Sequence, residues 1–207
     1  MPVEGAQYPV NLILAGKRCL VVGGGPVAAR KVAGLVACGA DVHVIAADPG
    51  PEVTALGVSV EARPYRPGDM VGYRLVIAAT NDSALNRAIF AEAEAAGTWV
   101  NSADDPASCT FTLPSIVRQG PIMVTVSTGG RSPALATWLK HRIAGDLGPE
   151  YQVLVDLLSS VREDMRAAGR STEEADWKSV LDSDMLELIK AGQVSVARER
   201  LTSWLLS

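Results

Sequence analysis

The feature that most constrains this chain is its glycine run, Gly23-Gly24-Gly25. A short apolar stretch, Cys19–Val22, comes before it, and a segment with helical spacing, from Pro26 to about Cys38, comes after it. This order of strand, G-x-G-x-x-A turn and helix is the signature of a dinucleotide-binding βαβ unit. Glycines let the backbone approach a pyrophosphate, and the helix N-terminus offers it N–H groups and a positive dipole end. Because glycine triplets also form ordinary turns, the surrounding sequence has to show whether this one binds a nucleotide.

Strands and helices are predicted to alternate through the next eighty residues. Apolar or alternating runs predict strands, and a helix capped by Asp82 or Ser83 is predicted to end at Gly97. The predicted strands are Val10–Leu14, Cys19–Val22, Ala40–Ala46, Val58–Ala62, Leu75–Ala79 and Trp99–Asn101. Such alternation predicts an α/β fold with a parallel, doubly wound, Rossmann-like sheet.

Polar residues follow two of these strands, where open α/β sheets bind ligands. Asp48 stands where a ribose-binding acid is expected, and no arginine beside it could receive a 2′-phosphate, which favours NAD over NADP. The alternative is that Asp48 merely opens a turn before Pro49. Thr80 and Asn81 follow the next central strand, and plain turn chemistry is the alternative to a cofactor role for them.

The loop Asn101–Pro106 is the first candidate for chemistry. It is polar and follows a strand, and its adjacent carboxylates Asp104 and Asp105 could raise the pKa of one another so that one acts as a base. The alternative is that Asp105-Pro106 only forms a turn.

A different pattern follows this loop. Two strands, Cys109–Val117 and Ile122–Ser127, predict an antiparallel hairpin, and Ser132-Pro133 is a typical start of a helix. The glycines Gly129 and Gly130 before that helix could form an anion-binding nest. Residues 106–145 contain no Asp or Glu and four basic residues, although the whole chain carries −4. This charge suggests an acidic small-molecule substrate or, alternatively, a protein interface.

Composition excludes several classes of protein. A net charge of −4 argues against a general nucleic-acid binder. No signal peptide and no membrane-spanning stretch is expected, and three widely spaced cysteines indicate neither disulfides nor a zinc site, so we expect a cytoplasmic protein.

The last third of the chain is predicted to be helical. From Pro149, apolar stripes run over 154–165, 177–188 and 194–205. We therefore expect a nucleotide-binding domain over 1–112, a hairpin-plus-helix segment over 113–147 and a helical domain over 148–207.

Several motifs in this order resemble the precorrin-2 dehydrogenase family, also found as the N-terminal part of siroheme synthase. They are Gly23-Gly24-Gly25-x-Val27-Ala28-x-Arg30-Lys31, Ala78–Asp82, Asn101-x-x-Asp104-Asp105-Pro106, Phe111-x-x-Pro114-Ser115 and Ser127-x-Gly129-Gly130-x-Ser132-Pro133. The resemblance covers about residues 10 to 145. It implies NAD-dependent oxidation of precorrin-2, an acidic tetrapyrrole, to sirohydrochlorin, and a homodimer built through the segment after the Rossmann domain.

The resemblance also implies roles for single residues. Asp104 would be the acid-base residue, and no residue is expected to hold a metal. The cofactor would be NAD, bound by Gly23, Gly25, Pro26, Val27, Ala47, Asp48, Thr80 and Asn81. The substrate would be bound by Asn101, Ser127, Thr128, Gly129, Gly130, Arg131 and Ser132. Thr128 stands where many relatives have serine, so the hydroxyl is kept and a role that needs serine itself is in doubt.

Three other functions are alternatives to this one. In some members of the family the same site also inserts ferrous iron, and neither His43 nor His141 shows the spacing of a metal ligand. A non-catalytic NAD-sensing or interaction module is the second alternative. A short-chain reductase is excluded because no tyrosine is followed by lysine at the fourth place. The chain shows no methylating domain, so a separate uroporphyrinogen methyltransferase is expected to supply the substrate.

Overall fold

The computed structural model describes residues 5–103 and 105–206, and the chain divides into two compact units. The first unit comprises the chain up to Leu113 together with Gly129–Arg131, and the second comprises Pro114–Thr128 and Ser132 onward. We describe each unit by itself.

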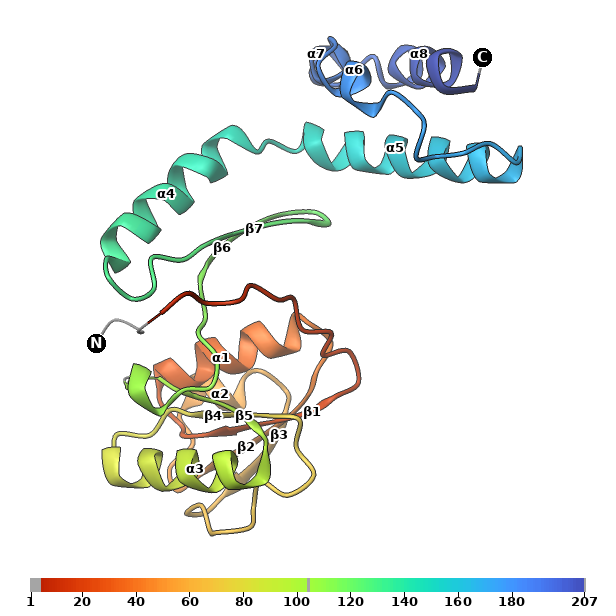
Figure 1. Ribbon diagram of the computed structural model, residues 1–207. Helices are drawn as coiled ribbons and strands as arrows, with labels where there is room; N and C mark the ends of the chain where they lie inside the picture. The colour runs from red at the N-terminus through yellow and green to blue at the C-terminus, as the bar shows by residue number, and fades with distance from the viewer. Residues whose placement is uncertain (1–4, 104, 207) are drawn as a thin grey trace. The chain divides into compact units, whose positions relative to one another are not determined.

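The first unit is an α/β layer structure (Figure 1). Its strands form one parallel sheet in the order β3-β2-β1-β4-β5, which is the doubly wound order predicted for a dinucleotide-binding unit. Its strands are β1 (Arg18–Val22), β2 (Asp41–Ala46), β3 (Ser59–Ala62), β4 (Leu75–Ala78) and β5 (Trp99–Ser102), and its helices are α1 (Pro26–Val36), α2 (Pro51–Thr54), α3 (Ser83–Ala96) and the 3-10 turn η1 (Pro106–Ser108). The order reverses between β1 and β4, and the loops that follow these two strands therefore lie side by side.

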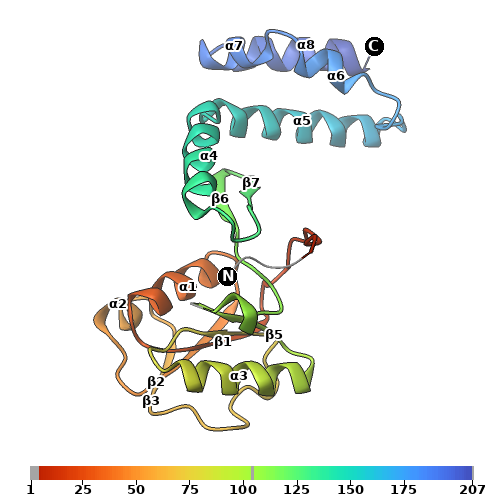
Figure 2. The same ribbon diagram turned by 60° about the vertical axis from the view of Figure 1, so that its left-hand side comes forward.

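The sheet is buried on both faces. Helices α1 and α2 cover one face and α3 covers the other, as both views show (Figures 1 and 2). Alternate residues of β1 point to opposite layers: Cys19 and Val21 pack with Val32 of α1, whereas Leu20 and Val22 lie in the same cluster as Ile89 of α3. This packing explains why β1 and β4 are continuous apolar runs rather than alternating ones.

Capping residues and a proline set the ends of the helices in the first unit. Asp82 caps α3 by accepting hydrogen bonds from the N–H groups of Ala84 and Leu85, and Gly97 ends it in the left-handed region at φ 66°. Pro26 occupies the first turn of α1, where its missing N–H costs nothing.

The second unit combines a hairpin with helices. Strands β6 (Ser115–Gln119) and β7 (Ile122–Val126) pair antiparallel, and α4 (Pro133–Asp146) packs on them. Helix α5 (Glu150–Ala167) packs on α7 (Met185–Lys190) and α8 (Val194–Leu206), with α6 (Trp177–Leu181) between α5 and α7 in the chain. Leu157, Val161, Met185 and Leu201 are among the residues of its apolar core. None of the helices in the described part of the chain is long and apolar enough to cross a membrane.

The predicted fold class is confirmed: a parallel sheet is followed by a hairpin with a helix and by a helical C-terminal region. Three local predictions are wrong. Val10–Leu14 forms no strand among the described residues, and of its apolar side chains only Leu14 is buried, because no described strand pairs with this segment. The first hairpin strand begins at Ser115 rather than Cys109, because residues 109–111 bond to β5 instead. The stripe over 177–188 breaks into α6 and α7 at residues 182–184. The proposed domain boundary at 147/148 stays a prediction.

Candidate active site

The glycine turn has two residues that the fold itself requires. Gly23 has φ 130°, and a Cβ there would stand 2.3 Å from the carbonyl oxygen of Ala79, which follows β4. A Cβ on Gly24 would stand 2.3 Å from the carbonyl oxygen of Asp48, which follows β2. The Gly50 N–H also donates to the Gly24 carbonyl at 3.0 Å. Gly23 and Gly24 therefore allow the loops after three strands to converge at one edge of the sheet.

Gly25 is different because nothing else of the protein fills the space beside it. Apart from Gly25 and its two chain neighbours, no atom of the described residues lies within 4 Å of the position that its Cβ would take. Gly25 is the N-cap of α1, and no side chain accepts a hydrogen bond there. A helix N-terminus with open space beside a glycine is a suitable place for a phosphate, and Val27 lies in the first turn of the same helix.

Ala47 and Asp48 extend this edge toward β2. Both residues are exposed, and the Asp48 backbone lies directly against Gly24. The placement puts a carboxylate one loop away from the phosphate position, as a ribose-binding acid requires.

The loop after β4 is held by a buried amide that sequence reasoning missed. Asn86 of α3 accepts from the Thr80 hydroxyl at 2.7 Å and from the Thr80 N–H at 3.3 Å, and its own amide donates to the Thr80 carbonyl at 3.0 Å. Asn86 is 6% exposed and lies three residues before the buried Ile89, so a polar residue on an apolar stripe was the available signal. The Thr80 hydroxyl therefore shapes the loop, whereas Asn81 is exposed.

A small pocket opens between the ends of β4 and β5. Its volume is about 230 Å³, and it is lined by Thr80, Asn81, Ser83, Asn86, Ser102 and Asp105. Ser102 is 4% exposed, and its Oγ atom has no hydrogen-bond partner among the described residues. Since buried polar atoms are nearly always paired, this hydroxyl could bond to a polar group of a ligand in the pocket. Sequence reasoning did not single out Ser102, because a serine at a strand end carries no distinctive signal.

Of the two adjacent carboxylates, only Asp105 is among the described residues. Asp105 caps η1, since its carboxylate accepts from the Ala107 N–H at 3.1 Å and from the Ser108 hydroxyl at 2.8 Å. Asp105 therefore has the turn-forming role that was its alternative. Asp104, the predicted acid-base residue, lies outside the described residues, so its role stays a prediction.

The Asn101 side chain makes a structural hydrogen bond. It is 7% exposed and donates from Nδ2 to the Phe111 carbonyl at 2.9 Å, which holds the chain as it leaves the sheet. The neighbouring Cys109 thiol accepts from the Ser102 N–H at 3.2 Å, and burial raises the pKa of this thiol, so it stays neutral. A substrate contact by Asn101 stays a prediction.

The second unit holds part of the predicted substrate set. The Thr128 hydroxyl donates to the Ser132 carbonyl and accepts from the Ser132 N–H, both at 3.1 Å. Ser132 caps α4 by accepting from the Leu135 N–H at 3.2 Å. Thr128 thus closes the turn with the hydroxyl it shares with serine, so the threonine at this position preserves the geometry.

The other members of that set are the residues inside the turn. Gly129 and Gly130 have φ values of 60° and 76°, which glycine adopts without strain, and they pack with the first unit together with the exposed Arg131. Ser127 is exposed at the end of the hairpin. The substrate roles of Ser127 to Ser132 are not decided by these contacts.

The first unit fits a dinucleotide. The open space at Gly25 suits a pyrophosphate, and Asp48 lies on the β2 side of it. On the β4–β5 side lies the Ser102 hydroxyl, which is without a partner within 5–103 and 105–206. These groups lie along the carboxyl edge of one sheet, in the order that a molecule with two nucleoside ends would need.

Comparison with known proteins agrees with this geometry. The model of a family described as putative NAD(P)-binding matches residues 10–115. The siroheme synthases of Nitrosomonas eutropha and Nitrosococcus oceani are 37% and 40% identical to the chain over 201 and 208 residues. Each alignment covers 94% of this chain and only 42% or 43% of the relative, so the chain spans less than half of their length.

A solved structure named SirC, precorrin-2 dehydrogenase, has the same fold. Its TM-score is 0.73 at 24% identity, and the match covers 94% of this chain and 100% of that one. Since the family model matches more than half of the 207 residues and falls on the unit with the glycine turn, the chain belongs to this NAD(P)-binding family.

Proposed function

We propose that this protein is an NAD-dependent dehydrogenase that oxidises precorrin-2 to sirohydrochlorin. The observation that carries the proposal is the open N-terminus of α1 at Gly25, on a fold shared with a precorrin-2 dehydrogenase and in a chain related over 94% of its length to siroheme synthases. The acid-free segment 106–145 supports a substrate with many carboxylates.

NAD fits the nucleotide site better than NADP. The Asp48 carboxylate would accept hydrogen bonds from the two ribose hydroxyls, and it would repel a 2′-phosphate at the same place. The bound dinucleotide supplies a hydride acceptor, the nicotinamide ring. The residues at the ends of β4 and β5 would hold this ring, and the Ser102 hydroxyl, which has no partner among the described residues, would be available to the polar carboxamide.

Oxidation removes a hydride and a proton from the substrate. A bound NAD would accept the hydride together with the electron pair of the broken C–H bond. We assign the proton to the Asp104 carboxylate, which stands in the loop after β5 beside the structurally committed Asp105. The proposal therefore needs the Asp104 carboxylate to stand within reach of the carbon that loses the proton.

The test is anaerobic incubation of precorrin-2 with NAD while NADH formation is followed. Wild-type protein is expected to form NADH, and Asp104→Asn is expected to lose activity by a factor of about 10² to 10⁴. NAD affinity should stay the same in this variant, which separates lost chemistry from a damaged nucleotide site. Absence of NADH with the wild type would refute the dehydrogenase, and full activity of Asp104→Asn would refute only the assignment of the base.

The same incubation separates the remaining alternatives. A protein that only senses NAD would bind it without converting the tetrapyrrole. Addition of ferrous or cobaltous ions to sirohydrochlorin, with the absorbance of the metallated ring as readout, tests chelation independently. A uroporphyrinogen methyltransferase would provide the substrate, and both reactions are expected in the cytoplasm.

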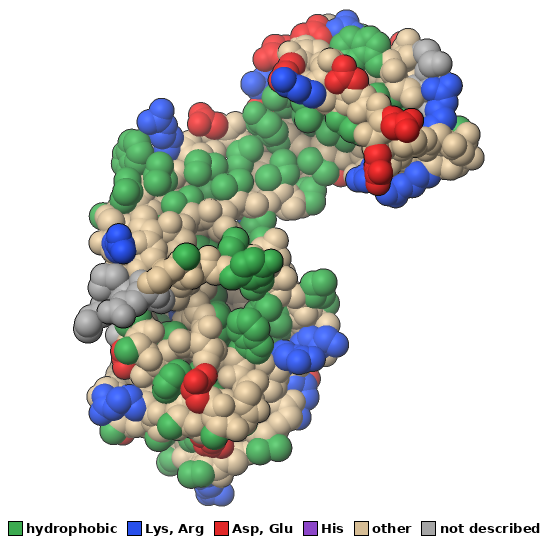
Figure 3. Space-filling model, viewed as in Figure 1, with side chains coloured by type: hydrophobic (Ala, Val, Ile, Leu, Met, Phe, Trp, Pro, Cys, Tyr) green, Lys and Arg blue, Asp and Glu red, His purple; other side chains and the backbone are tan. Residues whose placement is uncertain are grey.

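We also propose that the second unit forms a homodimer. A two-stranded hairpin has an unpaired edge on each side and is marginal by itself. Hydrophobic side chains lie exposed along α4 (Figure 3), with Leu135 47% and Trp138 55% exposed, and the apolar side chains of β7 beside it are half-buried. Light scattering should show a dimer that Leu135→Glu weakens, whereas Val196→Glu, on α8, should not; a wild-type monomer would contradict the proposal.

A further inference from the structure

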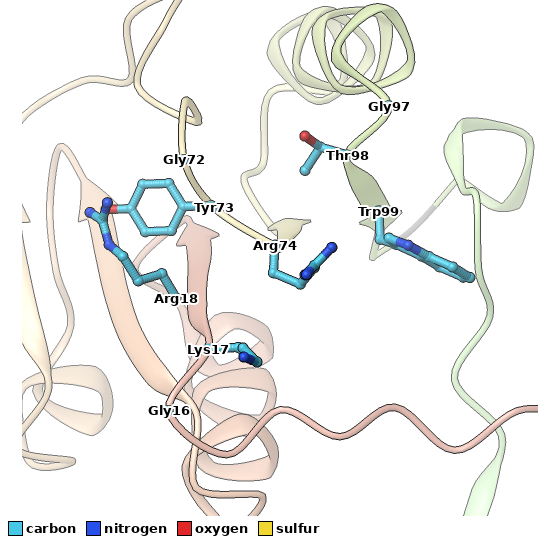
Figure 4. A pocket seen from close by; sticks show the side chains of 9 residues that line it. All are labelled: Gly16, Lys17, Arg18, Gly72, Tyr73, Arg74, Gly97, Thr98 and Trp99. Carbon is cyan, nitrogen blue, oxygen red and sulfur yellow. The ribbon is translucent and has the colours of Figure 1, made fainter.

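A second pocket lies at the amino ends of the central strands, on the edge opposite the glycine turn. Lys17 and Arg18 stand at the start of β1, Arg74 precedes β4, and Thr98 and Trp99 stand at the start of β5. These residues, with Tyr73 and three glycines, line a space of about 440 Å³ (Figure 4). Pockets of roughly 300 to 1,000 Å³ accommodate small molecules.

This pocket is separate from the nucleotide site. Strand β1 runs from Arg18 to Val22, so its five residues, at about 3.3 Å each, put roughly 16 Å between the two edges. A dinucleotide that lies along the carboxyl edge therefore does not reach Lys17 or Arg74. Any ligand of this pocket serves a role other than hydride transfer.

The three cations have no acidic partner in the part of the chain that the structure describes. None of the ion pairs there includes Lys17, Arg18 or Arg74. Asp41 is paired with Arg18 in the register of β1 and β2, and it forms no ion pair with this arginine either. The chain as a whole is acidic, with a charge of −4, so the cluster runs against the general composition.

Helix ends do not account for the cluster. Helix α3 ends beside Gly97, and a helix C-terminus carries a partial charge of about −0.5, which one cation would offset. Together, Lys17, Arg18 and Arg74 exceed this partial charge and the single carboxylate of Asp41, which leaves a positive potential in a concave site. The excess favours an anion with more than one charge.

The side chains are arranged to receive such an anion. The Arg18 guanidinium lies 4.3 Å from the centre of the Tyr73 ring, and the Tyr73 hydroxyl is 2.6 Å from His43 Nδ1, so this wall of the pocket is fixed. Lys17 and Arg74 lie between that wall and the Thr98–Trp99 side (Figure 4). Trp99 is 39% exposed, which makes its ring accessible as a contact surface and as a fluorescent reporter.

We propose that this pocket binds a small anion carrying several phosphate or carboxylate groups, held chiefly by Lys17 and Arg74. Arginine and lysine donate charge-assisted hydrogen bonds to both kinds of group, so the shared chemistry is a compact polyanion. Binding of triphosphate or of citrate would show whether the pocket prefers phosphate or carboxylate groups.

The experiment is calorimetric titration of the full chain with inorganic triphosphate and, in a parallel arm, with citrate. One or both should bind, and the arm that binds more tightly identifies the anionic group. Lys17→Gln and Arg74→Gln should each weaken binding about tenfold or more, because each removes a charge-assisted hydrogen bond. Arg87→Gln, which removes an exposed arginine of α3 outside the pocket, should change affinity less than about twofold.

Two further measurements locate the ligand. Saturating NAD should leave anion binding unchanged, because the two sites lie at opposite edges of the sheet. Binding should alter tryptophan fluorescence in the wild type, and Trp99→Phe should abolish this signal while calorimetric binding remains. The fluorescence experiment uses proteins that keep Lys17 and Arg74. It therefore remains a test of the pocket even if Lys17→Gln or Arg74→Gln folds poorly.

The proposal is overturned by any of four results. These are no binding of either anion at millimolar concentration, equal weakening by Arg87→Gln, displacement of the anion by NAD, and a fluorescence response that persists in Trp99→Phe. Equal weakening would indicate diffuse electrostatics, and displacement would place the anion at the glycine turn.

Discussion

Adjacent glycines of the turn should respond to the same substitution in opposite ways. We compare Gly24→Ala with Gly25→Ala, each of which adds a single methyl group. In the first variant the methyl carbon would stand 2.3 Å from the Asp48 carbonyl oxygen and 2.9 Å from the Pro49 Cα atom. In the second variant the methyl carbon would have no described residue within 4 Å other than its own chain neighbours.

The magnitudes follow from these contacts. Overpacking against backbone costs about 1 to 3 kcal/mol, and a shift of the Asp48 loop would also lose the hydrogen bond from Gly50 to Gly24, worth about 1 kcal/mol. Gly24→Ala should therefore lower the free energy of unfolding by about 2 to 4 kcal/mol. Gly25 has φ −83° and ψ −178°, which alanine adopts freely. In Gly25→Ala, alanine is a poorer N-cap than glycine, which destabilises the folded state, but it also makes the unfolded chain less flexible, which stabilises the folded state. The two effects nearly cancel, so the free energy of unfolding should change by less than about 1 kcal/mol.

For NAD binding, the informative variant is Gly25→Ala, because it should fold normally and still bind NAD more weakly. The Gly25→Ala methyl group would occupy the space assigned to the pyrophosphate, so NAD affinity should fall by about tenfold to a hundredfold through weakened charge-assisted hydrogen bonds. Urea unfolding followed by circular dichroism gives the stability, and calorimetric titration with NAD gives the affinity. Because the chain has two units, Trp99 of β5 provides a second probe that reports on the first unit.

Two results would refute this reasoning. If Gly25→Ala destabilises the protein as much as Gly24→Ala, the space beside Gly25 is not open in solution. If Gly25→Ala folds normally and binds NAD as the wild type does, the phosphates do not lie at this helix N-terminus.

The remaining predictions concern single side chains of the first unit. Asn86→Ala removes three hydrogen bonds to Thr80 and should lower the free energy of unfolding by about 3 kcal/mol, whereas the exposed Asn81→Ala should cost less than about 0.5 kcal/mol in the same urea assay. The Arg63 guanidinium lowers the pKa of the Asp69 carboxyl below its ordinary value of 3.8, so the stability from this pair is present above that value and is lost as the pH falls through the folded-state pKa. The difference in Tm between wild type and Asp69→Asn should therefore shrink as the pH is lowered from about 6 to about 3, and a constant difference would contradict it. Burial raises the pKa of the Cys19 thiol to about 11, so iodoacetamide at about pH 8 should modify Cys19 only on unfolding, as mass spectrometry of native and urea-treated protein can show.

Short-range patterns were enough to predict most of the first unit. The apolar run before Gly23 had to be a buried strand, and Asp82 and Gly97 marked the ends of α3 because capping depends on the few residues next to a helix end. The predictions failed where local pattern and available partners disagree. Val10–Leu14 is apolar enough for a strand, yet a strand exists only if a neighbour accepts its backbone hydrogen bonds.

The sequence by itself determined the parallel sheet, the glycine turn and the acid at the end of β2, because each depends on residue types at short, regular spacing. Only the tertiary structure decided that Gly23 and Gly24 serve the convergence of loops while Gly25 leaves room for a ligand. The same is true of three polar side chains: those of Asn86 and Asp105 are hydrogen-bonded within the scaffold, and the buried Ser102 hydroxyl has no partner in the part of the chain that the structure describes. The physical reason is that hydrogen-bond saturation and steric room depend on atoms brought together from distant parts of the chain, which no local pattern contains.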